Sequence, residues 1–193
     1  MYNTWEQRKF DELSQLYRGL TYKPSDVRKD GIRVLRSSNI DGNTFTIKND
    51  DVFVKPDVVK ISTAQKNDIL ITAANGSSSL VGKHALIDDS SELMVHGGFM
   101  LLAKPREPEF TNALMNSQWY RNFIFKFVAG GNGAIGNLKK SDLENQNILI
   151  PSSREQKQMG RLFSQLDNLI TLHQRKDDFY HGEKLSLHKF FHK

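Results

Sequence analysis

The first hundred residues alternate short apolar runs with polar turns, a pattern that predicts β-strands. Two predicted strands lie in IRVLRSSNI and NTFTIK, with the turn residues Asp41-Gly42-Asn43 between them. Further strands are predicted in NDILITAA, SLVGKHALID and LMVHGGFMLLAK, and a small polar loop, Asn75–Ser79, follows the first of these. Ahead of all of them, Thr4-x-x-Gln7 has the spacing of a capping box. It predicts a short helix through Leu16, unless the spacing is a coincidence at a chain end.

After Pro108 the apolar residues recur every three or four positions, which predicts helix through about Val128. The apolar positions are Phe110, Ala113, Leu114, Tyr120, Phe123, Ile124 and Phe127. A glycine-rich loop follows, then a short helix opened by Ser141-x-x-Glu144, and then the apolar run NILIP.

Pro151 is the clearest boundary, because Ser152 or Ser153 can cap a helix together with Glu155 or Gln156. This helix carries an apolar stripe with the three-and-four spacing of a short coiled-coil seam. The stripe consists of Met159, Leu162, Phe163, Leu166, Leu169, Ile170 and His173. It either packs on its own domain or pairs with another helix. Since the seam ends near Lys176, we expect a short helix.

Strands first and helices later predict an α+β fold. We expect a domain over residues 1–150, with a mixed or antiparallel sheet and flanking helices, and a coiled-coil-like helical region over residues 151–193. A chain of 193 residues can bury one real core and carry an appendage. It has no cysteine, no signal-peptide pattern and no apolar run of membrane-spanning length, so we expect a cytoplasmic protein without a membrane partner.

Charge points to a polyanionic partner. Lysine and arginine exceed aspartate and glutamate by 27 to 22, which leaves a formal charge of +5. Basic and amide side chains, which contact phosphates and base edges, gather in or beside the predicted loops. The candidate DNA-binding residues are Arg33, Arg36, Asn39, Asn75, Ser77, Ser78, Ser79, Lys83, His84, Asn132, Asn137, Lys139 and Lys140. Any one of them could equally belong to a solvated basic surface.

The glycines Gly131-x-Gly133-x-x-Gly136 have the spacing of a dinucleotide-binding turn. That turn needs a strand before it and a helix of several turns after it. Here the preceding segment is predicted to be helical, and too few residues separate Gly136 from the run NILIP for a crossover helix. We therefore interpret the glycines as a tight backbone turn, in which exposed amides could lie near a phosphate.

No pattern of catalytic or metal-binding residues stands out. The acidic and lysine residues of Pro56-Asp57 and Glu155-x-Lys157 lie far apart in the chain, and Glu155 is explained by a helix cap. His188 and His192 have helical spacing but no evident third ligand. We therefore expect neither catalysis, nor a metal, nor a cofactor on this chain.

Three stretches resemble the specificity subunits of type I restriction-modification systems. They are WEQRKFDEL, KNDILITAANGSSSLVGKHALI and GNGAIGNLKKSDLENQNILIPSSREQKQMGRLFSQLDNLITLHQRK, which together span most of the chain. The last is the most specific, because in that family a target-recognition domain closes on an isoleucine-proline run. Glu-Gln, a helix and a Leu-Asp pair then lead into a conserved long helix. The matching positions are Ile150-Pro151, Glu155-Gln156 and Leu166-Asp167.

The resemblance implies a non-catalytic subunit. Its recognition domain would read a few base pairs of one half of a bipartite site in the major groove of double-stranded DNA. Its helix would act as a spacer and as a docking surface for methyltransferase subunits, which bring S-adenosylmethionine. A motor-nuclease restriction subunit would bring ATP hydrolysis and cleavage.

The chain also departs from the family, whose usual members have two recognition domains and two conserved helices. This chain has one of each, so we expect a half-subunit or fragment that forms a homodimer through its helix. Two other interpretations stay open at this point. One is a stand-alone DNA-binding regulator, and the other is a dinucleotide-dependent enzyme built on the Gly131 turn.

Overall fold

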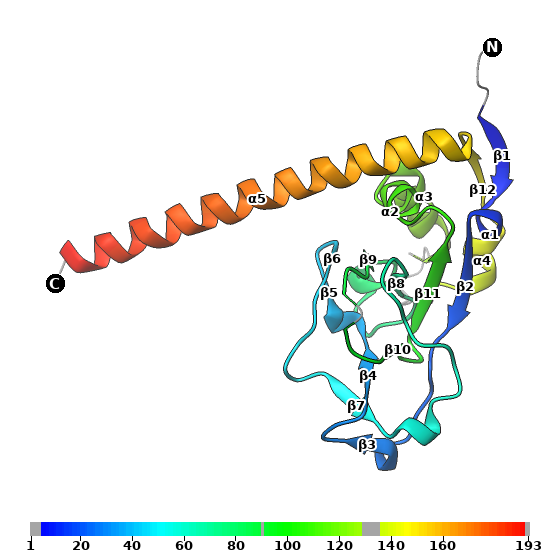
Figure 1. Ribbon diagram of the computed structural model, residues 1–193, viewed down its shortest axis with the longest axis horizontal. Helices are drawn as coiled ribbons and strands as arrows, with labels where there is room; N and C mark the ends of the chain where they lie inside the picture. Colours follow the sequence, from blue (N-terminus) through cyan, green and yellow to red (C-terminus); the bar gives the residue numbers. More distant parts are fainter. Residues whose placement is uncertain (1–4, 90, 129–135, 192–193) are drawn as a thin grey trace.

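The computed structural model describes residues 5–89, 91–128 and 136–191, with side chains described through residue 173. Figure 1 shows a globular part built on sheets, from which the helix α5 (Ser153–Phe191) extends far beyond the rest of the chain. Strand β1 (Glu6–Lys9) and the start of α5 lie at the same end of the globular part.

The largest sheet forms the centre of the globular part, with the strand order β2-β11-β8-β9-β6-β5 within the described residues. Its strands are β2 (Ser14–Arg18), β11 (Met100–Pro105), β8 (Ile69–Thr72), β9 (His84–Leu86), β6 (Thr44–Phe45) and β5 (Ile40–Asp41). All neighbours pair antiparallel except β6 and β9, which are parallel. Because β8 is buried on both faces, its sequence is a continuous apolar run instead of an alternating one. The expected α+β class with a mixed sheet is confirmed.

A second sheet has the order β10-β4-β7-β3. It consists of β10 (Met94–His96), β4 (Ile32–Leu35), β7 (Val52–Val54) and β3 (Val27–Arg28). The run LMVHGGFMLLAK, predicted as one strand, is therefore two strands in two sheets, with Gly97 and Gly98 in the turn between β10 and β11. Short 3-10 helices lie at Pro24–Asp26, Ser37–Asn39, Pro56–Val58 and Ser78–Leu80.

The prediction of a helix from the N-terminal capping box through Leu16 is wrong for the residues that the structure describes. Strand β1 pairs antiparallel with β12 (Asn147–Ile150), and only α1 (Phe10–Leu13) is helical before β2 begins. All four side chains of β1 are exposed, so its own sequence carries no strand pattern. The distant partner β12 determines its conformation, while the buried side chains of Phe10 and Leu13 anchor α1.

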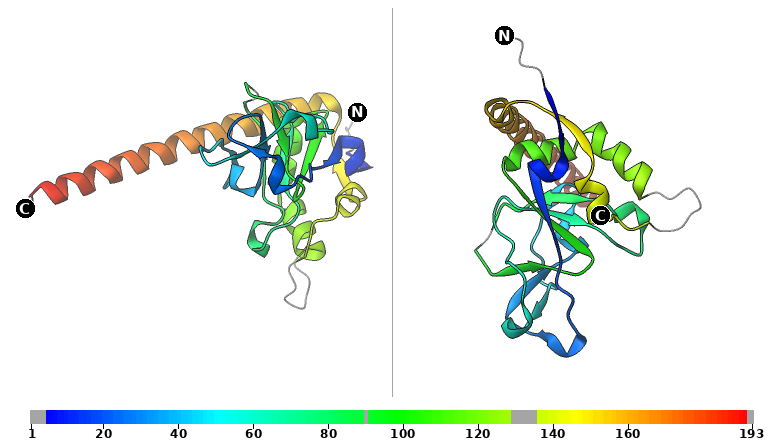
Figure 2. Two further views of the ribbon diagram at one scale, coloured as in Figure 1. Left: turned by 90° about the horizontal axis from the view of Figure 1, so that it is seen from below. Right: turned by 90° about the vertical axis from the view of Figure 1, so that its right-hand side faces the viewer.

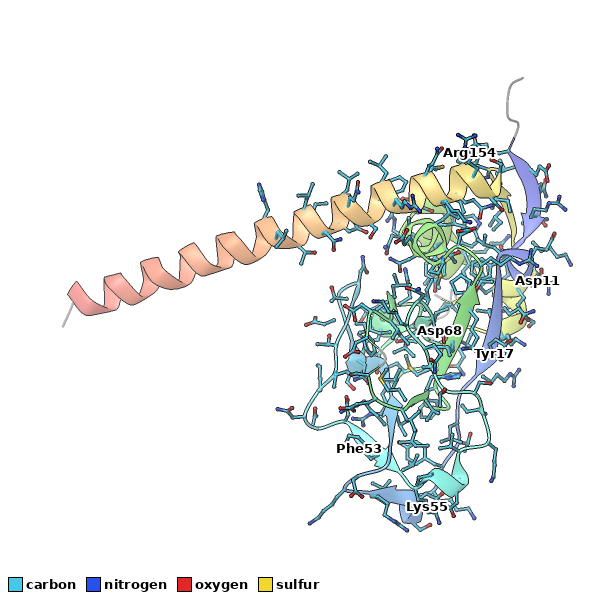
Figure 3. All side chains as sticks on the ribbon, in the orientation of Figure 1. Asp11, Tyr17, Phe53, Lys55, Asp68 and Arg154 are labelled. Atoms are coloured by element: carbon cyan, nitrogen blue, oxygen red, sulfur yellow. The ribbon has the colours of Figure 1, made fainter. Side chains whose placement is uncertain are left out.

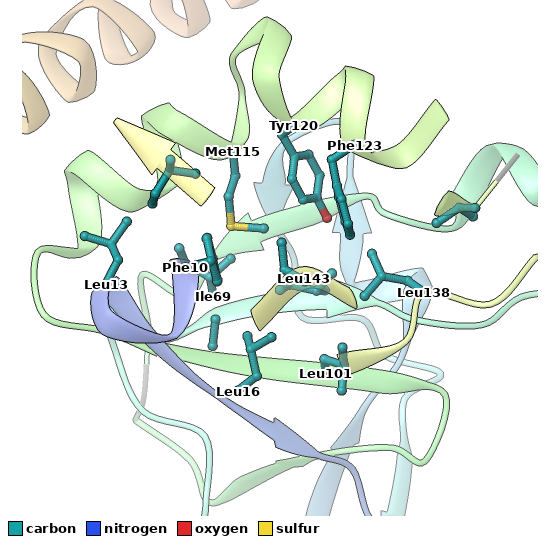
Figure 4. Packing of buried hydrophobic residues seen from close by; sticks show 14 of the residues in the cluster. Phe10, Leu13, Leu16, Ile69, Leu101, Met115, Tyr120, Phe123, Leu138 and Leu143 are labelled. Atoms are coloured by element: carbon teal, nitrogen blue, oxygen red, sulfur yellow. The ribbon is translucent and has the colours of Figure 1, made fainter. Parts of the chain in front are cut away.

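The helical stretch after Pro108 is confirmed, but it is divided at Asn116-Ser117 into α2 (Pro108–Met115) and α3 (Gln118–Phe127). The short helix α4 (Lys140–Glu144) is also present. Figure 4 shows the main core, where Met115, Tyr120 and Phe123 of these helices meet Phe10 and Ile69. Among the described helices, none is long and apolar enough to cross a membrane.

The first turns of α5 are tied to the globular part. The Ser152 backbone amide donates to the Glu155 carboxylate at 3.0 Å, and the Glu155 backbone amide donates to the Ser152 hydroxyl at 3.5 Å, which are the two bonds of the predicted capping box. The buried Gln156 amide donates to the Pro151 carbonyl at 2.9 Å. A Cβ at Gly160 would lie 2.7 Å from the Phe110 nitrogen, so glycine lets α5 and α2 approach closely. These contacts set the direction in which α5 leaves the globular part (Figure 2).

Beyond these turns α5 stands clear of the globular part, and its described side chains, through residue 173, project into open space (Figure 3). The expectation of a short helix is wrong, because α5 continues without a break to Phe191. The apolar stripe behaves differently at its two ends. Met159 packs against the main core, whereas the stripe from Leu162 to Ile170 is exposed, with exposed fractions from 43% to 59%.

Candidate nucleic-acid interface

A cleft of about 730 Å³ opens where β2 and β8 end and β11 begins. Residues from five separate parts of the chain line it. They are Leu20, Thr21, Tyr22, Arg36, Ser37, Ala74, Asn75, Gly76, Gly97, Gly98, Phe99, Met100 and Asn137. Because β2 and β8 both run antiparallel to β11, the C-terminal ends of β2 and β8 lie beside the N-terminal end of β11. The cleft is therefore a product of sheet topology and not of one continuous segment.

The backbone of Ala73 and Ala74 holds three walls of the cleft together. The Phe99 carbonyl accepts hydrogen bonds from the Ala73 and Ala74 amides at 2.9 and 3.0 Å. The Ala73 carbonyl accepts the Leu138 amide at 2.8 Å, which fixes the segment carrying Asn137. These backbone hydrogen bonds hold the three segments in fixed positions relative to one another. The side chains of Asn75, Phe99 and Asn137 therefore start from backbone positions that vary little.

The fourth wall is the segment after β4. The Asn75 side-chain amide donates to the Ser37 hydroxyl at 2.9 Å, which joins this wall to the end of β8. Arg36 lines the cleft, and its Nη2 donates only a long bond of 3.4 Å to the Asp50 carbonyl. Its Nε is buried without a hydrogen-bond partner in the described part of the chain. A guanidinium so weakly engaged retains donors for a ligand.

Three of the candidate DNA-binding residues thus come together in the cleft: Arg36, Asn75 and Asn137. Ser77, Ser78 and Ser79 are exposed in the loop that follows Asn75, and the Ser77 and Ser79 hydroxyls bond each other at 2.8 Å. Lys83 and Lys139 are exposed, and Lys140 forms an ion pair with Glu144 at 3.3 Å. Asn132 lies outside the described residues.

Arg33 and Asn39 are not at the cleft. The Arg33 guanidinium is buried between Asp51 at 2.8 Å and Glu92 at 2.7 Å, and it also lies 4.6 Å from the centre of the Phe53 ring. Burial by itself lowers the pKa of Arg33, but the hydrogen bonds and charges of Glu92 and Asp51 outweigh it and raise that pKa. The Asn39 amide donates to both Asp51 oxygens. These side chains are satisfied inside the protein, so we leave them out of the proposed interface.

His84 is also interior. Its ring packs edge-on against Tyr120 at 5.1 Å, and its Nδ1 lies 3.4 Å from the Gly82 carbonyl, which also accepts the Tyr120 hydroxyl at 2.9 Å. Burial lowers the pKa of His84 to about 4 and raises that of Tyr120. A neutral, buried imidazole is unsuited to phosphate contact, and we leave His84 out as well.

Sequence reasoning missed Phe99 and Tyr22 as lining residues of the cleft. The available signal for Phe99 was the pair Gly97-Gly98, since two glycines inside an apolar run indicate a turn. Of the glycine motif, only Gly136 is described. A Cβ there would lie 2.0 Å from the Val128 carbonyl, so this glycine permits the chain to pass close to the end of α3. The segment before the motif is the helix α3, as expected, and the only helix in the stretch described between Gly136 and β12 is the five-residue α4.

The arrangement of the cleft suits recognition of nucleic-acid surfaces. A guanidinium can donate to base edges, the two carboxamides can both donate and accept, and an exposed aromatic ring adds apolar contact. The exposed Lys83 and Lys139 can contact phosphates. Within the described residues, no group of three histidine, aspartate or glutamate side chains could hold a metal ion.

Solved structures show the same fold. The chain matches one chain of a type I restriction-modification system with a TM-score of 0.66 and 14% identity, over 91% of this chain and 41% of that one. It matches the HsdS subunit from Thermoanaerobacter tengcongensis with a TM-score of 0.64 and 14% identity, over 91% and 40%.

Sequence comparison adds closer relatives. The chain is 31% identical over 175 residues to the type I restriction enzyme StySPI specificity subunit of Salmonella potsdam, which covers 85% of this chain and 37% of the relative. It is also 31% identical over 176 residues to the EcoKI specificity subunit of Escherichia coli K12, with the same coverage. The chain thus spans about 37% of the length of these curated relatives. The model of the type I restriction modification DNA specificity domain matches residues 2–178, and the chain therefore belongs to this family.

Proposed function

We propose that this chain is a sequence-specific DNA-recognition subunit, or part of one, in a type I restriction-modification complex. The observation that carries the proposal is the cleft, where Arg36, Asn75 and Asn137 converge from three distant segments. Residues 1–150 act as the target-recognition domain and read one half of a bipartite site in double-stranded DNA. Residues 151–193 act as the helical spacer. The end of β12 at Ile150 and the helix cap at Ser152 support this division.

The partners follow from the family. Methyltransferase subunits dock on the chain and carry S-adenosylmethionine, and the restriction subunit carries the motor and nuclease activities. This chain contributes recognition and no catalytic step, in keeping with the names of its relatives as specificity subunits. We place the complex in the cytoplasm, where type I systems meet DNA.

A second copy of the chain pairs with the exposed stripe of α5. Leu162, Phe163, Leu166, Leu169 and Ile170 are large apolar side chains with exposed fractions of 43% to 59%. Such a patch is costly on a monomer, so a partner helix is expected. In an antiparallel two-fold pair each stripe covers the other, and two identical recognition domains would face an interrupted palindrome.

The test of recognition is a map of methylated bases in cells that express this chain with its methyltransferase partner. We expect one interrupted motif for the wild type, and loss or relaxation of one base position for Arg36→Ala. A motif that the cleft variants Arg36→Ala and Asn75→Ala leave unchanged would place recognition elsewhere. Purification of the chain without any methyltransferase would favour a stand-alone regulator.

The test of pairing is molar mass by light scattering over a range of protein concentrations. Wild type should move toward the dimer mass as concentration rises, and Leu162→Glu with Leu166→Glu should stay monomeric. The control Gln165→Glu with Asn168→Glu adds the same charge outside the stripe and should still pair. A wild type that stays monomeric at high concentration, with and without specific DNA, would rule out the homodimer.

A further inference from the structure

Phe99 is a large apolar side chain that is exposed at the cleft. It is the last residue of the turn before β11, and 75% of it is exposed, whereas Met100 and Leu101 after it are buried. Among the residues that line the cleft it is the most prominent apolar side chain open to solvent. An exposed phenylalanine adds nothing to the core of this protein, so its ring is available to a ligand of the cleft.

The backbone that carries Phe99 is held on several sides. The Gly97 amide donates to the Leu35 carbonyl at 2.9 Å, and the Met100 amide donates to the Gly97 carbonyl at 2.8 Å. A Cβ at Gly98 would lie 3.2 Å from the Thr21 hydroxyl, which shows how closely the turn packs on the segment after β2. With the two bonds from Ala73 and Ala74 to the Phe99 carbonyl, the ring extends from a fixed base.

The polar side chains of the cleft and the Phe99 ring can contact different atoms of a base pair. Arg36, Asn75 and Asn137 offer donors and acceptors for the polar atoms of base edges. The phenylalanine ring offers only apolar surface. In the major groove the apolar feature of a base pair is the C5-methyl group of thymine.

We propose that Phe99 contacts the C5-methyl group of one thymine in the recognised half-site and thereby determines specificity at that position. This proposal rests on the proposed function, because it requires that the cleft faces DNA. Arg36 and the two asparagines then select neighbouring positions through hydrogen bonds, and the rigid turn sets the spacing between these contacts.

The experiment replaces each thymine of the methylated motif, one at a time, by deoxyuridine, which lacks only the methyl group. Competition binding is measured for the complex of this chain with its methyltransferase. For the wild type we expect one position at which the substitution weakens binding roughly fourfold, the equivalent of about 0.8 kcal/mol for one buried methyl group. For Phe99→Ala the uracil and thymine duplexes should bind equally at that position, and Phe99→Leu should retain part of the preference.

The control is Phe125→Ala, which removes a phenylalanine of similar exposure, 77%, that does not line the cleft. It should leave the preference for thymine intact. If Phe99→Ala weakens all duplexes equally, including those with uracil, the ring inserts between bases and the proposal is overturned. It is also overturned if wild-type binding is indifferent to every uracil. If the wild type does not prefer the motif over unrelated DNA, the proposed function itself fails.

Discussion

Arg33 and Arg36 lie three residues apart near the end of the same strand, but their side chains have different surroundings. Arg33, within β4, is buried against two carboxylates and an aromatic ring. Arg36, just beyond β4, lines the open cleft and makes one long hydrogen bond to a backbone carbonyl. The sealed cluster around Arg33 includes Asn39 and Asp51, and the open region includes Asn75 and Asn137. The same residue types hold the fold together in one region and remain available to a ligand in the other.

The difference lies in what the rest of the chain brings to each site. Asp51, whose side chain has no exposed surface, accepts bonds from Arg33, Asn39 and the Lys48 amide. The Arg33 guanidinium, the Asn39 amide and the Asp51 carboxylate all have partners there, as burial requires. In the cleft the Arg36 Nε lacks a partner among the described residues. Within the described part of the chain, the terminal nitrogens of Arg36 make no hydrogen bond shorter than the 3.4 Å contact of Nη2 with the Asp50 carbonyl, so this guanidinium keeps donors for a ligand.

The largest effect should come from the sealed cluster. Arg33→Met leaves the carboxylate of Asp51 buried without its cation and should lower the free energy of unfolding by about 3–5 kcal/mol. Lys55→Met is the matched control, because Lys55 pairs with Asp26 at 3.2 Å in a partly exposed position and its loss should cost less than about 1 kcal/mol. Urea denaturation measures both. Equal losses in the two variants would show that the Arg33 cluster is not specially stabilising.

The second effect is a pH dependence that originates in buried His84. Its pKa is about 4 in the folded protein and about 6.5 in the unfolded chain. Above pH 6.5 both states are neutral and stability is unaffected. Between pH 6.5 and 4 only the unfolded state takes up the proton, so the free energy of unfolding should fall by roughly 3 kcal/mol.

The measurement is urea denaturation at several values of pH, for the wild type and for His84→Leu. The variant should lose less stability than the wild type on going from pH 7 to pH 4. Some loss should remain in the variant, since burial also lowers the pKa of His96. Parallel curves for the two proteins would contradict the assignment to His84.

The third effect concerns the open region and should appear mainly in DNA binding. Asn75→Ala or Arg36→Ala, if the side chain contacts a base, should reduce discrimination at one base position by roughly 1–3 kcal/mol. Because Arg36 makes one long hydrogen bond, Arg36→Ala should change the free energy of unfolding by less than about 0.5 kcal/mol, whereas Asn75→Ala also loses its bond to Ser37 and should cost about 1 kcal/mol. Binding to duplexes with single base changes tests this. A uniform loss for all duplexes would indicate a phosphate contact instead.

The smallest effect is expected outside the cleft. Lys139→Ala with Lys140→Ala should weaken binding to all sequences alike and reduce the slope of log affinity against log salt by about one unit per lost phosphate contact. Lys140 is paired with Glu144, so Lys139 should account for most of the change. Glu144→Gln is the control. It removes the partner of Lys140 and should slightly raise the affinity of the protein for DNA. A salt slope equal to that of the wild type would exclude both lysines from the DNA contact.

Several features were determined by local sequence. The 3.6-residue period after Pro108 led to α2 and α3, and the Ser-Glu spacing after Pro151 led to the start of α5. The continuous apolar run of β8 and the turn at Gly42, where φ is +61°, were likewise local signals. Residues 150 to 167 also carried enough of the family pattern to indicate the class of subunit. Period, caps and turns act over a few residues, so a single segment contains all the information they need.

Only tertiary structure decided which polar residues face a ligand. Arg33 is sealed by Asp51 and Glu92, and β1 is a strand because β12 pairs with it, although these partners lie far away in the chain. The same holds for α5, whose apolar stripe is covered at Met159 and open from Leu162 onward because the globular part reaches only its first turns. Burial and pairing depend on contacts between segments distant in sequence. No local pattern contains that information, and the cleft with Phe99 at its edge became visible only when those contacts were in place.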